Sequence, residues 1–190
     1  MKAQGLEQTI LWRRIDSPGH DACGLWSSDN GWRLTGTAVF CLESQPCHLS
    51  YEVDCDSSWH ARSATVTGWI GRDVVKLAIV ALPGQRWSLN GAEQARVTGC
   101  IDVDLNFTPA TNLIQLRRLA LRVGDKADAP AAWLRFPDVV LERLEQHYGR
   151  VELNRYEYQA PSVGYAAPLD VTDIGFVTRY PGLWEVEACA

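Results

Sequence analysis

The sequence predicts a mainly β fold, arranged as an antiparallel sheet, roll or barrel. Several short segments alternate apolar with polar residues, which is the pattern of a strand with one buried face. Turn-forming residues recur roughly every eight to twelve positions, a spacing typical of antiparallel sheets. With 46% apolar residues among 190, the chain can bury a substantial core, so we expect one domain over residues 1–190.

The clearest strand signals lie in the N-terminal half. Residues 32–40 are rich in β-branched and aromatic side chains, and residues 63–70 alternate Ser or Thr with Ala or Val. A short run over residues 49–53 leads into an acidic stretch, and residues 75–79 place three aliphatic side chains on one strand face. The Asn-Gly dipeptide at positions 90–91 indicates the tip of a hairpin.

Two segments have helical features. Residues 109–118 follow Thr108, a suitable N-cap residue, and begin with a proline, which suits the first helical position. Residues 137–148 place Leu141 and Leu144 about one helical turn apart, with charged residues on the other side. On periodicity alone, the second segment is the better helix candidate.

Strand signals return after Gly149. Tyr156 and Tyr158 share one face of a predicted strand. Residues 170–180 are expected to form a last pair of strands, and residues 180–184 a turn that ends on aromatic side chains.

The net charge of −5 excludes several classes of partner. Nucleic acid is not expected as the main partner, because phosphate binding needs a basic surface. The same charge argues against docking to anionic membranes by electrostatics alone. No segment approaches the roughly 20 apolar residues that cross a bilayer, and the N-terminus has no apolar signal-peptide core. We therefore expect a cytoplasmic protein without integral membrane association.

The chain shows no motif for a cofactor, a metal or a catalytic nucleophile. Nucleophile elbows, phosphate-binding loops and dinucleotide fingerprints are missing from the sequence. The His20–Cys23 and Cys47–His48 pairs come closest to metal spacing, but neither forms a zinc motif. No cofactor, metal site or catalytic residue is therefore assigned. In the cytoplasm all six cysteines are expected to stay reduced: Cys23, Cys41, Cys47, Cys55, Cys100 and Cys189.

Two acidic residues, Asp102 and Asp104, alternate with apolar neighbours. On a strand their carboxylates would share one face, about 7 Å apart. Such a pair can perform acid–base chemistry or hold a cation, or it can pair with nearby arginines. The sequence leaves these alternatives open.

Arg117 and Arg118 lie within an apolar segment. If residues 116–123 form a strand, Arg117 shares a face with leucines and needs a carboxylate partner. We therefore expect a buried ion pair between Arg117 and Asp102 or Asp104. The alternative is an anion or head-group site at the bottom of a pocket.

Eight tryptophans are many for this length. They can fill the core, or some can line an apolar or sugar-stacking surface. Trp59 lies in a polar cluster with Arg62, and Trp133 and Trp184 also neighbour polar motifs. These three tryptophans are the expected wall residues of a binding surface.

The order of these motifs resembles a bacterial glycolipid-binding family that was earlier described as a domain of unknown function. The resemblance rests on DVD at 102–104, TPATN at 108–112 and RRL at 117–119. Further matches are DSSWHAR at 56–62, QHY at 146–148 and TRYPGLW at 178–184. Gln115 stands where the family commonly has a proline, which makes a helix across this segment easier.

The resemblance implies a spiral β-roll, a long curved antiparallel sheet wrapped around a single α-helix and assembled as a homodimer. It also implies a likeness to bacterial lipoprotein-carrier half-barrels. With one helix inside the roll, residues 109–118 become the preferred helix, and residues 137–148 are expected to be largely strand, against their periodicity.

Three functions are consistent with these observations. The first is binding of a glycolipid or other amphiphile without catalysis. The second is an enzyme that uses Asp102 or Asp104 as acid–base and Arg117 as a clamp for a small anionic substrate. The third is a dimeric protein whose polar network is structural. The candidate ligand-binding residues are Trp59, Arg62, Asp102, Asp104, Asn112, Arg117, Arg118, Trp133, Gln146, Tyr148, Tyr180 and Trp184.

Overall fold

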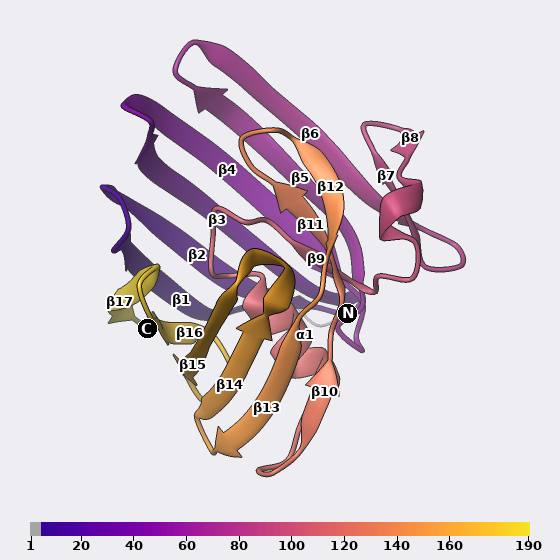
Figure 1. The fold of residues 1–190 in the computed structure, drawn as a ribbon, viewed down its shortest axis with the longest axis vertical. Helices are drawn as coiled ribbons and strands as arrows, with labels where there is room; N and C mark the ends of the chain where they lie inside the picture. Colours follow the sequence, from indigo (N-terminus) through magenta and orange to yellow (C-terminus); the bar gives the residue numbers. More distant parts are fainter. Residues whose placement is uncertain (1–4) are drawn as a thin grey trace.

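The computed structural model describes residues 5–190, which form one long antiparallel sheet of fourteen strands and a separate sheet of three. The long sheet is curved and not closed, because its end strands β10 and β8 do not pair with each other. A single α-helix, α1, lies between the N-terminal and the C-terminal strands (Figure 1). The expected mainly β roll around one helix is confirmed.

The N-terminal half of the long sheet is a meander in which each strand pairs with the next. Its strands are β1 (Gly5–Arg14), β2 (Gly19–Ser28), β3 (Gly31–Leu42), β4 (Gln45–Cys55), β5 (Ala61–Ile70), β6 (Asp73–Leu82), β7 (Arg86–Leu89) and β8 (Ala92–Glu93). The predicted Asn-Gly turn joins the last two, and a short 3₁₀ turn, η1 (Ala95–Val97), follows.

The C-terminal half adds six strands on the other side of β1. They are β10 (Lys126–Asp128), β13 (His147–Glu152), β14 (Arg155–Ala160), β15 (Tyr165–Val171), β16 (Val177–Tyr180) and β17 (Trp184–Cys189), with the 3₁₀ turn η2 (Pro161–Val163) before β15. Strand β17 pairs with β1, so Cys189 lies opposite Ile10. Residues 170–180 span the expected pair of strands, but β17 follows them and they are not the last.

The small sheet contains β9 (Asp102–Asp104), β11 (Ala131–Arg135) and β12 (Val140–Leu144). Strands β9 and β11 run parallel, with Asp102 opposite Ala131. Strand β12 comes from the segment whose periodicity predicts a helix. That prediction is wrong, because the backbone of residues 140–144 pairs with β11 along its whole length.

Helix α1 (Asn112–Leu119) fills the inner side of the roll, and its first five residues are all buried. The expected helix over residues 109–118 therefore forms, but it begins three residues later. Thr108 does not cap the helix. Its hydroxyl accepts a hydrogen bond from the Ala110 N–H (3.0 Å), which stabilises the turn that leads into the helix. The helix ends at Ala120, which has a left-handed backbone conformation.

Alternation along the strands separates the core from the outer face. In β4 every second residue from Cys47 to Cys55 is buried, and the residues between them are partly exposed. The core includes large aromatic side chains from both halves of the chain, such as Trp12, Trp87 and Phe176. No helix among residues 5–190 has the length and apolar character needed to cross a bilayer.

All six cysteines are free thiols. Cys189 is exposed, whereas Cys23, Cys47, Cys55 and Cys100 are buried. Burial also raises the pKa of Cys100 to about 11, which keeps it protonated and unreactive near neutral pH.

We expect thiol titration under denaturing, non-reducing conditions to give six thiols for the whole chain. In the native protein, a disulfide reagent should modify Cys189 first, because the four buried thiols are protected. Two or more cysteines found in disulfide bonds would contradict the expected cytoplasmic location.

Candidate functional site

A cavity of about 250 Å³ opens beside the start of α1. Strands from both sheets contribute to its wall, with Asp104 from β9, Trp133 from β11, Tyr158 from β14 and Tyr180 from β16. Asn112, the first residue of α1, lines the same cavity. The cavity therefore lies where the helix, the small sheet and the C-terminal half of the long sheet meet.

The floor of the cavity carries one buried carboxyl group. Asp104 is 8% exposed, and its oxygens accept hydrogen bonds from the Asn106 backbone N–H (2.9 Å) and from Gln146 Nε2 (2.9 Å). No ion pair reaches Asp104 from the described part of the chain. Burial raises the pKa of Asp104, and the two hydrogen bonds oppose that shift. The group is consequently a weak acid in an apolar setting.

Gln146 connects this carboxyl group to the helix and to the tyrosines. Its Nε2 also donates to the Tyr158 hydroxyl (3.0 Å), and its Oε1 accepts from Gln115 Nε2 (3.3 Å). All contacts of the Gln146 side chain lie inside the protein, because the residue is fully buried. The Gln115 Oε1 atom is buried without a hydrogen-bond partner. The Gln146 side chain therefore holds the Asp104 carboxyl group in place, whereas the Gln115 Oε1 acceptor stays unsatisfied.

Four tyrosine rings pack together at the cavity, where Tyr158, Tyr165 and Tyr180 line it and Tyr148 lies behind them. The Tyr158 ring lies 4.9 Å from Tyr148, 5.7 Å from Tyr180 and 6.0 Å from Tyr165, measured between centroids. Burial raises the pKa of Tyr165 to about 12, and it also raises the pKa of Tyr148, Tyr158 and Tyr180 above the usual value. All four hydroxyls therefore stay protonated near neutral pH and remain neutral hydrogen-bonding groups.

Asn112 and Trp184 complete two further sides of the cavity. The Asn112 Nδ2 atom donates to the Tyr148 hydroxyl (2.8 Å), which ties the first turn of α1 to β13. Trp184 is 4% exposed, and the Arg14 guanidinium lies 5.2 Å from its ring centroid. Trp133 is only partly buried and presents the more accessible indole.

Comparison with known proteins identifies the family. A family model described as "Putative glycolipid-binding" matches residues 9–186. The chain belongs to this family. A solved DUF1089 family protein from Pseudomonas aeruginosa is similar to it, with 27% identity and a TM-score of 0.77 over 87% of this chain and 91% of that one. A search of the curated proteins gives no match.

In this member of the glycolipid-binding family, the cavity gathers many of the residues singled out from the sequence. Five of them line it: Asp104, Asn112, Trp133, Tyr180 and Trp184. Gln146 and Tyr148 lie directly behind and bond to lining residues. These seven come from segments far apart in the chain, which the roll brings together.

Asp102 and Arg118 form a separate, buried ion pair. Arg118 donates from Nε to Asp102 Oδ1 (2.8 Å) and from Nη2 to Asp102 Oδ2 (2.5 Å), and the Asp102 side chain is fully buried. Burial raises the pKa of Asp102, and the Arg118 guanidinium only partly opposes that shift. This bidentate pair joins the end of α1 to β9 and does not line the cavity.

The prediction that Arg117 pairs with Asp102 or Asp104 is wrong. Arg117 is exposed, its guanidinium lies 5.3 Å from the Trp59 ring centroid, and Nη1 is 3.5 Å from the Ile174 carbonyl oxygen. The segment is helical rather than extended, so successive side chains point about 100° apart. Arg118 therefore faces Asp102, and Arg117 faces solvent.

Trp59 and Arg62 also lie outside the cavity. Trp59 is 6% exposed and stacks on Trp32, with centroids 4.7 Å apart. Arg62 is exposed and lines a different hollow on the outer face of the long sheet.

Several cavity residues were not singled out from the sequence. Tyr158 and Tyr165 line the cavity, as do Asn106 and Thr108. The shared face of Tyr156 and Tyr158 was the available signal, because alternation places both on the inner side of β14. Nothing local shows that Tyr165 and Tyr180 meet there.

Behind Thr108 lies a second buried carboxyl group. The Tyr51 hydroxyl donates to Asp21 Oδ1 (3.2 Å) and Oδ2 (3.0 Å), and the Thr108 hydroxyl also donates to Asp21 Oδ2. Asp21 is fully buried, and burial raises its pKa to about 7. Among residues 5–190, no group of three or more His, Cys, Asp or Glu side chains could hold a metal ion.

Proposed function

We propose that the cavity binds the polar head of an amphiphile, such as a glycolipid, and performs no chemistry on it. The observation that carries this proposal is the combination of aromatic walls with buried hydrogen-bonding groups that face the same cavity. Trp133 and Tyr180 supply apolar surface, and Asp104, Asn112 and the tyrosine hydroxyls supply donors and acceptors. Convergent polar groups in an aromatic pocket are typical of small-molecule sites.

The size of the cavity limits what enters it. About 250 Å³ is slightly below the range of roughly 300–1,000 Å³ for pockets that enclose a drug-sized ligand. Helix α1 also occupies the inner side of the roll, and its first five residues are buried. We therefore propose that a sugar head enters the cavity and the lipid tail stays outside. The family description supports this ligand class.

Binding should quench the tryptophan emission. We expect titration with short-chain glycolipids and lyso-lipids to quench it at micromolar concentrations, which corresponds to about −8 kcal/mol. Trp133→Ala should weaken this binding about tenfold, because it removes the accessible indole of the cavity wall. Trp184 also lines the cavity, but it is part of the core, so its replacement would disturb folding.

Trp69→Ala is the matched control. Trp69 is 41% exposed and does not line the cavity, so its loss should leave the affinity unchanged. Absence of quenching across the lipid panel would refute the proposal and leave a structural role for the polar network. Equal affinities of the parent and Trp133→Ala would place the ligand elsewhere.

One observation favours a second candidate, an enzyme acting on a small anionic substrate. Asp104 faces the cavity with a raised pKa and no ion partner, as a general acid would. However, Asp102 is paired with Arg118, and Arg117 does not reach the cavity, so the proposed clamp is not assembled. Mass spectrometry of incubated glycolipids, with Asp104→Asn as control, separates turnover from binding.

The family resemblance further leads us to propose a cytoplasmic homodimer. Light scattering coupled to size-exclusion chromatography tests the assembly.

A further inference from the structure

The outer face of the long sheet carries a row of four polar or aromatic side chains. Trp26, Arg33, Asp54 and Ser63 are successive partners across β2, β3, β4 and β5. They point away from the core, because their neighbours along each strand are buried: Leu25, Leu34, Val53 and Ala64. Cross-strand partners lie close enough for their side chains to act as one surface.

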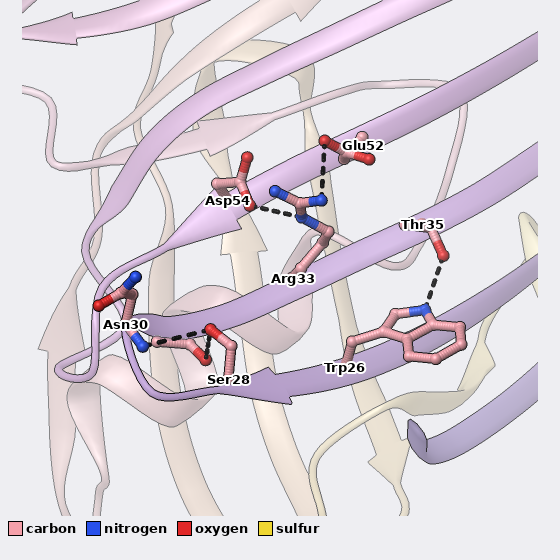
Figure 2. Close-up of polar contacts among 8 residues, drawn as sticks. Trp26, Ser28, Asn30, Arg33, Thr35, Glu52 and Asp54 are labelled. Atoms are coloured by element: carbon pink, nitrogen blue, oxygen red, sulfur yellow. Dashed lines mark hydrogen bonds and ion pairs between the residues drawn. The ribbon is translucent and has the colours of Figure 1, made fainter. Parts of the chain in front are cut away.

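This row borders a hollow of about 410 Å³. Trp32, Asn30 and Arg62 line it together with the row, and none of its lining residues belongs to the cavity beside α1. Figure 2 shows its polar contacts, with Arg33 between Asp54 and Glu52 and the Trp26 indole beside Thr35.

The side chains at this hollow are fixed by their neighbours. Arg33 Nε donates to Asp54 Oδ1 (2.7 Å), and Nη1 lies 3.5 Å from Glu52 Oε1. Trp26 Nε1 donates to Thr35 Oγ1 (2.9 Å), which satisfies the polar edge of the indole and holds its orientation. A ligand therefore meets a preorganised surface.

Three other groups at the hollow have no hydrogen-bond partner among the described residues: the Arg62 guanidinium, the Asn30 side-chain amide and Arg33 Nη2. Arg62 makes no ion pair there, and the Asn30 backbone N–H, not its side-chain amide, bonds to Ser28. The Arg33 contacts use Nε and Nη1 and leave Nη2 available. The two arginines are offset by Asp54 and Glu52, so the surface has no strong net charge.

We propose that this hollow is a carbohydrate-binding site for neutral sugars. A pyranose ring can stack on the Trp26 indole, because the face of an aromatic ring carries negative charge that attracts polarised C–H groups. Adjacent sugar hydroxyls can bond simultaneously to the planar groups of Arg33, Asp54 and Asn30, which offer paired donors and acceptors. The balanced charge favours a neutral sugar over an acidic one.

The test uses maltose, cellobiose and lactose as probes, with a glucuronate-containing disaccharide as the acidic comparison. Calorimetry on the full chain should detect at least one neutral disaccharide with a dissociation constant of about 1 mM. Trp26→Ala should weaken this binding at least about tenfold, and Arg62→Gln should weaken it by a smaller factor. Trp69→Ala and Arg72→Gln are the controls, because both residues are exposed and neither lines the hollow.

Failure of all three neutral disaccharides to bind would overturn this proposal. So would equal affinity of the parent and Trp26→Ala, or clearly tighter binding of the acidic disaccharide. Trp133→Ala should bind the soluble disaccharide like the parent, since Trp133 lines only the other cavity. The outcome is therefore separable from that of the glycolipid titration.

Discussion

Arg118→Met is expected to lower the free energy of unfolding by about 3–5 kcal/mol. Arg118 is the bidentate partner of Asp102, whose side chain is fully buried. Methionine keeps much of the side-chain volume but leaves the carboxylate without its counter-charge. Equilibrium denaturation with urea near neutral pH measures the change.

Arg117→Met is the matched control, because it removes the adjacent, exposed arginine of the same helix. We expect it to cost less than about 1 kcal/mol, since a solvated cation over an aromatic ring contributes little. Similar unfolding curves for Arg118→Met and Arg117→Met would show that the Asp102 pair does not stabilise the fold.

The second large effect concerns Asp21 and pH. Burial raises the pKa of Asp21 from 3.8 to about 7, while hydrogen bonds from Thr108 and Tyr51 oppose the shift. Because the folded state holds this proton more tightly than the unfolded state, stability from Asp21 is greatest below about pH 4 and falls until about pH 7. Between these two pH limits, the contribution of Asp21 to the free energy of unfolding changes by on the order of 4 kcal/mol.

Asp21→Asn removes this titration. We expect its stability relative to the parent to rise as the pH increases from about 4 to 7, and to level off above that. Urea unfolding of both proteins over this pH range checks the difference. Asp73→Asn, an exposed acid at the start of β6, should instead follow the parent at every pH. A constant offset between Asp21→Asn and the parent would contradict the assigned pKa.

The meander of the N-terminal half follows from local patterns. Residues 32–40 and 63–70 lie within β3 and β5, because their alternation matches one buried and one solvated face. The Asn-Gly hairpin tip at positions 90–91 is equally local. These elements need no information from elsewhere in the chain.

The helix and the small sheet depend on distant partners. Residues 137–148 have helical periodicity, yet residues 140–144 pair with β11. Strands β9 and β11 pair in parallel although the whole of α1 lies between them in the sequence. No local pattern therefore predicts their pairing. The resemblance to the family corrected the helix where periodicity failed.

The candidate site was predictable only in part. The motifs singled out Asp104, Asn112 and Tyr180, which line the cavity. They could not show which arginine faces Asp102, because that depends on the phase of α1 about its axis. The contacts among Tyr158, Tyr165 and Tyr180 depend on the register of three strands. The alternation of residues within each strand does not determine that register.

The pairing of β1 with β17 has a consequence for how the protein folds. Strand β1 is synthesised long before β17, its partner on one side. Until β17 emerges, β1 presents an unpaired edge, which is a template for association with other nascent chains. The N-terminal meander can assemble first, and closing the long loop between β1 and β17 is expected to be the slow step that joins the two halves.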